Sequence, residues 1–354
     1  MSYQIRYKYH QLHFKFKAGT SRGVMTKRDV YFITIYHTNS PQTIGLGECA
    51  PLVKLSIDDV PDYEEQLAHF CQKAAQLNSL QELYNLEGIA AFPSILTGLE
   101  MAFQDLANGG KRLLYDAAFM NSGARIPING LVWMGTKSFM YDQIKTKLDA
   151  GFKCIKMKIG AINFDEECEL LAYVRKQFAP SDITLRVDAN GAFSPQEALD
   201  KLQRLAQFDI HSIEQPIKQK QWDAMAELCE KSPLPIALDE ELIGITRSQK
   251  EQLLKHISPP YIILKPTLVG GFASSNEWIQ LAESLNIGWW MTSALESNIG
   301  LNAIAQFTAM HQVSIPQGLG TGQLFHNNIP SPLSIENGSI FYDQSMPWDL
   351  KDCV

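Results

Sequence analysis

The sequence predicts an α/β protein, a (β/α)8-type barrel with an α+β capping domain built from the N-terminal part and the C-terminal tail. Residues 3–16 and 30–36 alternate apolar and polar side chains, as strands of an antiparallel sheet do. From about residue 126 onward, short apolar strands alternate with polar helical segments, a repeat typical of parallel sheets. Eight repeats, and no Gly-x-Gly-x-x-Gly turn, favour a closed barrel over an open dinucleotide-binding sheet.

The bulk composition restricts the class of partner. With 354 residues, 45% of them hydrophobic and 19% charged, the chain is long enough for one large domain or two ordinary ones. A formal net charge of −7 and the lack of any Lys/Arg cluster argue against nucleic acid or an anionic membrane as partner and favour a small molecule. The composition gives no indication of the oligomeric state.

The N-terminus and the cysteines both indicate a cytoplasmic protein. The first residues lack the basic-then-apolar pattern of a signal peptide, and no run of about 18 apolar residues appears. The six cysteines are scattered, without the paired spacing of a zinc site or a disulfide framework, and are expected to be reduced.

Residues 1–122 are predicted to form the capping domain. After its two strands, residues 59–77 have helix-forming composition, and residues 94–106 carry apolar side chains at helical spacing. Residues 323–354, rich in Asn, Pro and aromatic residues, do not continue the barrel repeat, and we expect this tail to return to the capping domain.

Residues 123–322 are predicted to form the barrel. Its strands are expected at residues 127–132, 154–159, 184–187, 212–213, 236–238, 261–264, 288–291 and 313–316. Amphipathic helices are expected between them, among others at residues 165–178, 195–206 and 277–285.

Two lysines interrupt the second of these strands. Residues 154–159 are otherwise apolar, and Lys156 and Lys158, two positions apart, project from one face of a strand. Burial and like charge both lower the pKa of a lysine, which allows an amine to take a proton near neutral pH. A surface strand with a solvated charged face is the alternative interpretation of this segment taken alone.

Charged residues follow the ends of the next strands at regular intervals. Counted from Lys158, Asp188, Glu214, Asp239 and Lys265 come at successive steps of 30, 26, 25 and 26 residues. Each step fits one strand and helix, and in a barrel the C-terminal strand ends meet at the face where active sites lie. A single Asp in this position is commonly a helix N-cap, but a series in register indicates a shared site.

The three carboxylates in this series predict a metal site. Asp188, Glu214 and Asp239 offer only oxygen ligands, which Mg²⁺ prefers, with Mn²⁺ as an alternative. Without a cation they would repel one another and raise their own pKa values. A cation that binds a substrate carboxylate would stabilise the charge that develops when a lysine removes the proton from the adjacent carbon.

The series Lys156-x-Lys158, Asp188-x-Asn190, Glu214, Asp239-Glu240 and Lys265 resembles the active-site series of the enolase superfamily, in its muconate-lactonizing subgroup. The resemblance covers nearly the whole chain. It implies the barrel and capping domain predicted above, and it implies that residues 19–23 and 45–52 are two mobile specificity loops of the capping domain.

Residues 126–133, 292–297 and 318–324 are similar to segments of a dehydratase of this subgroup. The resemblance implies a carbon–oxygen lyase that converts 2-succinyl-6-hydroxy-2,4-cyclohexadiene-1-carboxylate to 2-succinylbenzoate by syn-dehydration in menaquinone biosynthesis.

An N-succinylamino acid racemase or a dipeptide epimerase with the same lysine pair and metal is an alternative, and a non-catalytic barrel protein is another. Dipeptide epimerases generally carry an Asp-x-Asp element beyond the seventh strand, where this chain has Ser293 and Ser297. The roles of Glu241 and Glu296 stay open.

The resemblance also implies roles for the lysines. Lys158 would be the general base and, once protonated, the acid that assists departure of the hydroxyl group from the same side. Lys265, on the opposite side, would stay protonated and stabilise the developing charge or lie over the ring. Lys156 would lower the pKa of Lys158.

Substrate contacts are expected from Arg22, Asn190, Ser293 and Gly318. Arg22 lies in a Gly/Ser-rich loop and would bind the succinyl carboxylate on loop closure, with a solvated arginine as the alternative. Asn190 would orient Lys156 or a ligand carboxylate, with a turn residue as the alternative.

Overall fold

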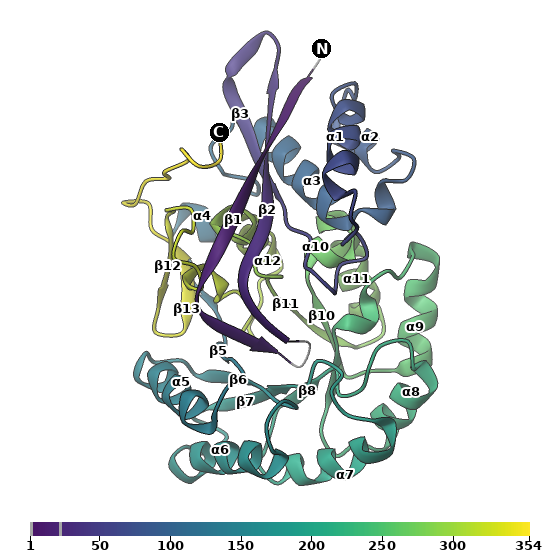
Figure 1. Ribbon diagram of the computed structural model, residues 1–354, viewed down its shortest axis with the longest axis vertical. Helices are drawn as coiled ribbons and strands as arrows, with labels where there is room; N and C mark the ends of the chain where they lie inside the picture. Colours follow the sequence, from purple (N-terminus) through teal and green to yellow (C-terminus); the bar gives the residue numbers. More distant parts are fainter. Residues whose placement is uncertain (1–2, 21–22) are drawn as a thin grey trace.

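The computed structural model describes residues 3–20 and 23–354, and its N-terminal part is a three-stranded antiparallel sheet. Strands β1 (Tyr3–Thr20), β2 (Gly23–His37) and β3 (Ser40–Cys49) pair in that order. Figure 1 shows the long β1–β2 hairpin extending from the helices of the capping domain to the barrel, and a bridge joins Gly19 to Met134 near its tip. This hairpin therefore carries capping-domain residues to the barrel.

Helices α1 (Tyr63–Ala74), α2 (Leu80–Leu83) and α3 (Pro93–Ala107) lie beside this sheet (Figure 1). The short α4 (Ala118–Asn121) follows them in the chain and lies next to the C-terminal tail. The predicted helices at residues 59–77 and 94–106 correspond to α1 and α3, and α3 is almost wholly buried against β3.

The prediction that residues 45–52 form a mobile loop is wrong for residues 45–49, which are the buried end of β3. The glycines there serve packing. A Cβ on Gly47 would collide with the carbonyl of Gly98 on α3, and one on Gly98 would collide with the Cys49 side chain. Because only glycine permits this approach, the strand and helix backbones lie in close contact.

Within the described residues, seven of the eight predicted barrel strands pair in sequence order as one parallel sheet. They are β5 (Gly130–Val132), β6 (Cys154–Lys158), β7 (Thr184–Asp188), β8 (Ser212–Glu214), β9 (Ile236–Leu238), β10 (Tyr261–Leu264) and β11 (Gly288–Met291). The connecting helices are α5 (Lys137–Asp149), α6 (Phe164–Gln177), α7 (Pro195–Ala206), α8 (Trp222–Lys231), α9 (Lys250–Ile257), α10 (Pro266–Val269), α11 (Gly271–Ser284) and α12 (Asn298–Ala309). In the described residues, none of the helices is long and apolar enough to cross a membrane.

Two single-residue bridges join the ends of this sheet. Gln317 bridges to Ile128 beside β5, and Gly318 bridges to Thr292 beside β11, both in parallel orientation. The predicted eighth strand at residues 313–316 therefore lies just before the pairing residues. The predicted first strand is also divided, since β4 (Ile126–Pro127) pairs with the tail rather than with the barrel.

The tail contacts both parts of the protein. Strands β12 (Leu333–Glu336) and β13 (Ser339–Tyr342) form a sheet with β4. Phe325 bridges to Phe14 on β1, and the Asn327 side chain accepts a hydrogen bond from the His13 backbone N–H at 2.8 Å. The division of the chain at residues 122 and 322 stays a prediction.

Two buried glutamates of the capping domain bind the N-termini of barrel helices. Glu100 on α3 accepts hydrogen bonds from the backbone N–H groups of Phe272, at 2.7 Å, and Ala273, at 2.9 Å, in the first turn of α11. Glu48 at the end of β3 accepts from the backbone N–H groups of Ser297 and Gly300, both at 2.8 Å, at the start of α12. Since helix N-termini carry unpaired N–H groups and partial positive charge, these contacts fix the capping domain over the barrel.

Burial raises the pKa of Glu100 from 4.5 to about 7, although hydrogen bonds from Tyr84 and the two backbone groups oppose the shift. The folded protein then holds a proton that the unfolded chain releases. This contribution to stability is fully present below about pH 4.5 and is lost as the pH rises through about 7.

We predict that the wild type loses about 2 kcal/mol of unfolding free energy between pH 5 and pH 8 that the Glu100→Gln variant does not lose, because glutamine does not titrate. Urea unfolding at both pH values measures the difference. The exposed Glu87→Gln variant is the control and should follow the wild type. Parallel pH profiles for Glu100→Gln and the wild type would contradict this account.

Candidate active site

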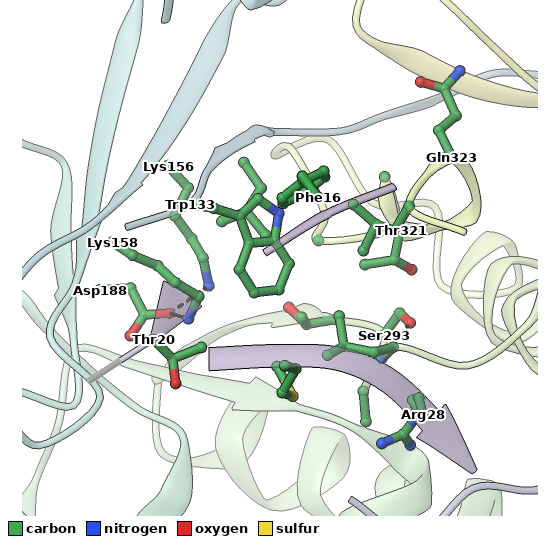
Figure 2. Close-up of a pocket in the computed structure, with 18 of the residues that line it drawn as sticks. Phe16, Thr20, Arg28, Trp133, Lys156, Lys158, Asp188, Ser293, Thr321 and Gln323 are labelled. Carbon is green, nitrogen blue, oxygen red and sulfur yellow. Dashed lines mark hydrogen bonds and ion pairs between the residues drawn. The ribbon is translucent and has the colours of Figure 1, made fainter. Parts of the chain in front are cut away.

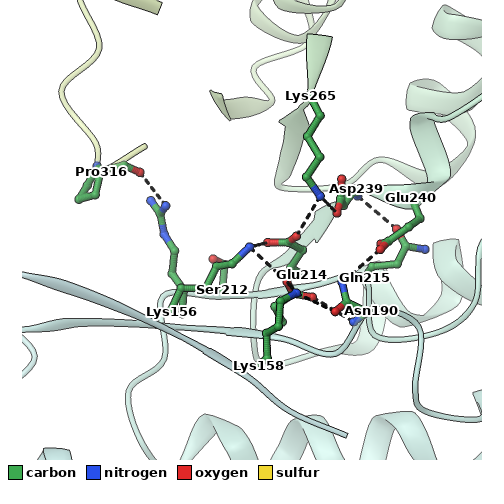
Figure 3. Close-up of polar contacts among 12 residues, drawn as sticks. Lys156, Lys158, Asn190, Ser212, Glu214, Gln215, Asp239, Glu240, Lys265 and Pro316 are labelled. Atoms are coloured by element: carbon green, nitrogen blue, oxygen red, sulfur yellow. Dashed lines mark hydrogen bonds and ion pairs between the residues drawn. The ribbon is translucent and has the colours of Figure 1, made fainter. Parts of the chain in front are cut away.

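The strand ends bring the predicted lysines and carboxylates together. The parallel pairing of the strands places Lys158 on β6 beside Asp188 on β7, and Asp188 beside Glu214 on β8. Asp239 and Lys265 come one residue after β9 and β10. Figure 3 shows the resulting network of contacts. Because neighbouring parallel strands end at one level, side chains distant in sequence meet at one face of the barrel.

Each lysine of the series contacts a carboxylate. Lys158 Nζ donates to Asp188 Oδ2 at 2.8 Å, and Lys156 Nζ lies 3.2 Å from the same oxygen and donates to Glu214 Oε2. Lys265 Nζ donates to Asp239 Oδ2 and lies 3.8 Å from Glu214 Oε1. The side chains are at most 11% exposed, so the three positive and three negative groups form one buried cluster.

The cluster separates the proton affinities of its lysines. Burial lowers the pKa of Lys158, and the neighbouring Lys156 charge adds to this effect, while Asp188 opposes it without reversing it. For Lys156 and Lys265, burial also favours the neutral amine, but the carboxylates outweigh it and raise the pKa. Lys158 is therefore the amine of the cluster best suited to accept a proton, and the sequence prediction that Lys156 lowers its pKa agrees with this direction.

The pKa values of the three carboxylates also shift in different directions. Burial raises the pKa of Glu214 to about 8, and repulsion from Asp188 and Asp239 contributes. Burial acts on Asp188 and Asp239 too, but Lys158 and Lys265 respectively outweigh it and lower their pKa values. Glu214 is thus the carboxylate whose charge is least compensated by the lysines.

The donor set fits a hard divalent cation. Glu214 Oε1 is buried and accepts no hydrogen bond from the residues that the structure describes. All three carboxylates supply oxygen ligands, which suit Mg²⁺ or Mn²⁺. In the arrangement that the structure shows, lysine ammonium groups contact these carboxylates. The described residues accordingly contain no group of three or more acidic, histidine or cysteine side chains placed to hold a metal ion.

A cavity of about 640 Å³ lies between these strand ends and the capping domain, a size typical of small-ligand sites. The β1–β2 hairpin and residues 52–55 form one wall, and barrel residues from Asn129 to Thr321 form most of the rest, together with Gln323, Leu324 and Ile335 of the tail. Within it, Trp133 places its ring centroid 5.9 Å from Lys158 Nζ (Figure 2). The cavity therefore connects capping-domain residues with the charged cluster.

Three of the four predicted substrate contacts line this cavity, namely Asn190, Ser293 and Gly318, while Arg22 lies outside the described residues. Ser293 Oγ donates to Glu296 Oε2 at 2.5 Å. A Cβ on Gly318 would collide with the Thr292 hydroxyl, so glycine is required for this approach.

Asn190 is expected to orient Lys156 or a ligand carboxylate, and its backbone N–H does donate to Asp188 Oδ1, at 3.0 Å. The lysine that its side chain contacts is Lys158 and not Lys156, which corrects the other half of that expectation. Asn190 Oδ1 accepts from Lys158 Nζ at 2.8 Å, and its Nδ2 donates to Glu240 Oε1 at 3.1 Å. Its φ of 45° also makes it a turn residue, so the alternative interpretation applies at the same time. Asn190 therefore connects Lys158 to the loop that follows β9.

The two glutamates whose roles were open are buried and bonded to protein groups. Glu296 accepts from Thr267 Oγ1 and Ser293 Oγ, each at 2.5 Å. Glu241 accepts from the Lys220 backbone N–H at 2.7 Å and from Gln215 Nε2 at 3.2 Å. Both carboxylates hold strand-end loops in place.

Sequence reasoning missed several polar residues of the cavity. They share a buried polar atom that has no hydrogen-bond partner among the described residues: Arg28, Asn129, Trp133, Thr292 and Thr321. Thr292 follows directly after the seventh strand, a position that could have identified it. Arg28 lies within a strand of the capping domain, and no local signal indicates that it reaches the cavity.

The sequence is similar to those of known proteins over most of its length. The enolase C-terminal domain-like family matches residues 140–345. The o-succinylbenzoate synthase of Desulfotalea psychrophila is 45% identical over 95% of this chain and 98% of its own length. The N-succinylamino acid racemase of Thermus thermophilus is 30% identical over 82% of this chain and 78% of its own.

Solved structures show the same fold. The crystal structure of MenC from Desulfotalea psychrophila has a TM-score of 0.84 at 41% identity, covering 96% of this chain and all 100% of that one. The dipeptide epimerase of Enterococcus faecalis, complexed with Mg and the dipeptide L-Leu-L-Tyr, has a TM-score of 0.84 at 20% identity and covers 97% of both chains. At that identity the second match concerns the fold alone.

We predict that Glu241→Ala lowers the unfolding free energy by about 1–3 kcal/mol, because it removes the acceptor of the part-buried Lys220 backbone N–H group and one of the two acceptors of the buried Gln215 amide. Chemical denaturation measures the loss. Glu230→Ala, an exposed residue of α8, is the control and should change stability little. Equal stability of the two variants would show that Glu241 does not support the loop.

Proposed function

This chain belongs to the enolase superfamily, and from that membership we propose that it is an o-succinylbenzoate synthase. The enzyme would remove water from 2-succinyl-6-hydroxy-2,4-cyclohexadiene-1-carboxylate to give 2-succinylbenzoate, as a carbon–oxygen lyase in menaquinone biosynthesis. The observation that carries the proposal is the buried lysine and carboxylate cluster in a chain 45% identical to an o-succinylbenzoate synthase over 95% of its length.

Asp188, Glu214 and Asp239 would hold Mg²⁺, with Mn²⁺ as an alternative. When bound, the cation would supply positive charge that stabilises negative charge developing on the substrate carboxylate. Glu214 Oε1, which is buried and accepts no hydrogen bond from the described residues, supports this assignment, as does the raised pKa of Glu214. Asn190 and Lys156 would orient and balance the charges around it.

Lys158 would remove the proton from the carbon that bears the ring carboxylate. Its lowered pKa makes the neutral amine accessible, and Asn190 Oδ1 directs it. The ammonium group so formed would return a proton to the hydroxyl group leaving from the same face, so that water is released and Lys158 is neutral again. One residue would then serve both proton transfers of a syn elimination.

Lys265 would stay protonated throughout. The Asp239 and Glu214 carboxylates raise its pKa against the effect of burial. Figure 3 shows Lys265 and Lys158 on opposite sides of Glu214, so the ring would lie between them. A fixed ammonium group there would stabilise negative charge on the substrate without exchanging a proton.

The lysine pair is also compatible with an N-succinylamino acid racemase, the activity named for the Thermus thermophilus relative. A dipeptide epimerase would need an acidic group for the substrate amine beyond β11. There, Ser293 binds Glu296, whose two oxygens are both engaged by hydroxyl groups, and this favours the dehydratase. A non-catalytic role would leave the buried charges unexplained.

The substrate would be a small molecule, and the protein would act in the cytoplasm. All six cysteines are free in the structure, five of them buried, which suits a reducing compartment. Neither a nucleic acid nor a membrane is among the proposed partners.

We predict that purified protein with Mg²⁺ consumes the cyclohexadiene substrate, followed by its ultraviolet absorbance, and that Lys158→Ala reduces kcat by at least about 10³-fold. EDTA should abolish turnover. Lys176→Ala, an exposed lysine of α6, is the control and should retain activity. If folded Lys158→Ala turned over like the wild type, the assignment of the base would be wrong.

We also predict that Mg²⁺ raises the melting temperature of the wild type but not of Asp239→Asn, because the variant lacks one anionic ligand. Differential scanning calorimetry with and without Mg²⁺ measures this. The exposed Asp223→Asn variant should respond like the wild type. A full Mg²⁺ response in Asp239→Asn would show that this carboxylate is not a ligand.

A further inference from the structure

A buried arginine lies in the cavity wall away from the lysine cluster. Arg28 on β2 is only 4% exposed and lines the cavity. Its Nη2 donates to the carbonyl of Ala50 at 2.6 Å. Its Nε and Nη1 have no hydrogen-bond partner among the residues that the structure describes. A desolvated guanidinium with unused donors is costly unless an acceptor binds to it.

The nearest carboxylates do not provide this acceptor. Glu48 and Glu296 are close enough to influence Arg28 electrostatically. However, Glu48 is engaged by Ser297 and Gly300, and Glu296 by Thr267 and Ser293. Within the described ranges, neither glutamate forms an ion pair or hydrogen bond with Arg28. Its unused N–H groups are enclosed by the protein, and because the Arg28 side chain lines the cavity, a rotation of the guanidinium would present them to a ligand there.

Further unpaired polar groups belong to the same cavity. The hydroxyl groups of Thr292 and Thr321 are buried, and no partner for either is found in the described part of the chain. Figure 2 shows Arg28, Ser293 and Thr321 on one side of the cavity, with Lys156, Lys158 and Asp188 on the other. The cavity thus has a cationic group at each end.

The substrate in the proposed function has an anionic group at each end as well, a ring carboxylate and the terminal carboxylate of the succinyl arm. Resting on that proposed function, we infer that Arg28 binds the terminal carboxylate of the succinyl arm and selects substrates that carry it. Charge-assisted hydrogen bonds would use the N–H groups that have no protein partner. Arg28 would then position the substrate, because holding the terminal carboxylate would keep the ring at the other end of the substrate against the lysines.

The substrate and its analogue with a primary amide in place of the terminal carboxylate test this inference. For the wild type we expect kcat/KM to favour the acid by about 30-fold or more, because the amide has the same shape but lacks the charge. In Arg28→Met this preference should disappear. Relative to the wild type, KM for the acid should rise about 30-fold and kcat for the acid should stay within about threefold. The kcat and KM values for the amide should be nearly unchanged. Arg28→Lys should retain part of the preference, and Arg6→Met, an exposed arginine of β1, should retain all of it.

Three outcomes would overturn the inference. If Arg28→Met lost kcat/KM equally with acid and amide, Arg28 would only support the fold through Glu48 and Glu296. If Arg28→Met did not fold, the wild type and Arg28→Lys would still test the inference. Equal kcat/KM values for acid and amide in the wild type would exclude recognition of the terminal carboxylate. If the Mg²⁺-loaded wild type acted on neither compound, the proposed function itself would fail and this inference with it.

Discussion

The structure depends on the burial of six opposite charges at the strand ends of one barrel. Three lysines and three carboxylates there are nearly inaccessible to solvent, and each would destabilise the fold by several kcal/mol if it were alone. They are tolerated because the adjoining strand ends place each positive group beside a negative one: Lys156 beside Glu214, Lys158 beside Asp188 and Lys265 beside Asp239. The same enforced proximity separates the pKa values of Lys158 and Lys265, which is the property that acid–base chemistry requires.

The capping domain completes this environment. Glu48 and Glu100 bind the N-termini of α12 and α11, which follow the last two barrel strands, so the β1–β2 hairpin lies over the charged cluster. The cavity is therefore lined from both sides, by the cluster at the barrel and by Arg28 from the hairpin. Substrate selection and proton transfer would thus reside on different parts of the chain, held together by a few buried carboxylate contacts.

Much of the barrel site could be predicted from sequence because its signals are local and periodic. Lysines in an apolar strand and charges at intervals of one strand and helix identify Lys158, Asp188, Glu214, Asp239 and Lys265 without knowledge of their contacts. What the sequence could not show depends on approaches between distant segments. Glycines that allow β3 to pack on α3 look like loop residues, and the barrel closes through single bridges rather than through an apolar strand.

The most direct test of this account is a crystal structure of the protein with Mg²⁺ and 2-succinylbenzoate. We expect Asp188, Glu214 and Asp239 to bind the metal, and the Lys158 and Lys265 amines to lie on opposite faces of the product ring. A metal bound elsewhere, or a ring carboxylate remote from both lysines, would contradict it.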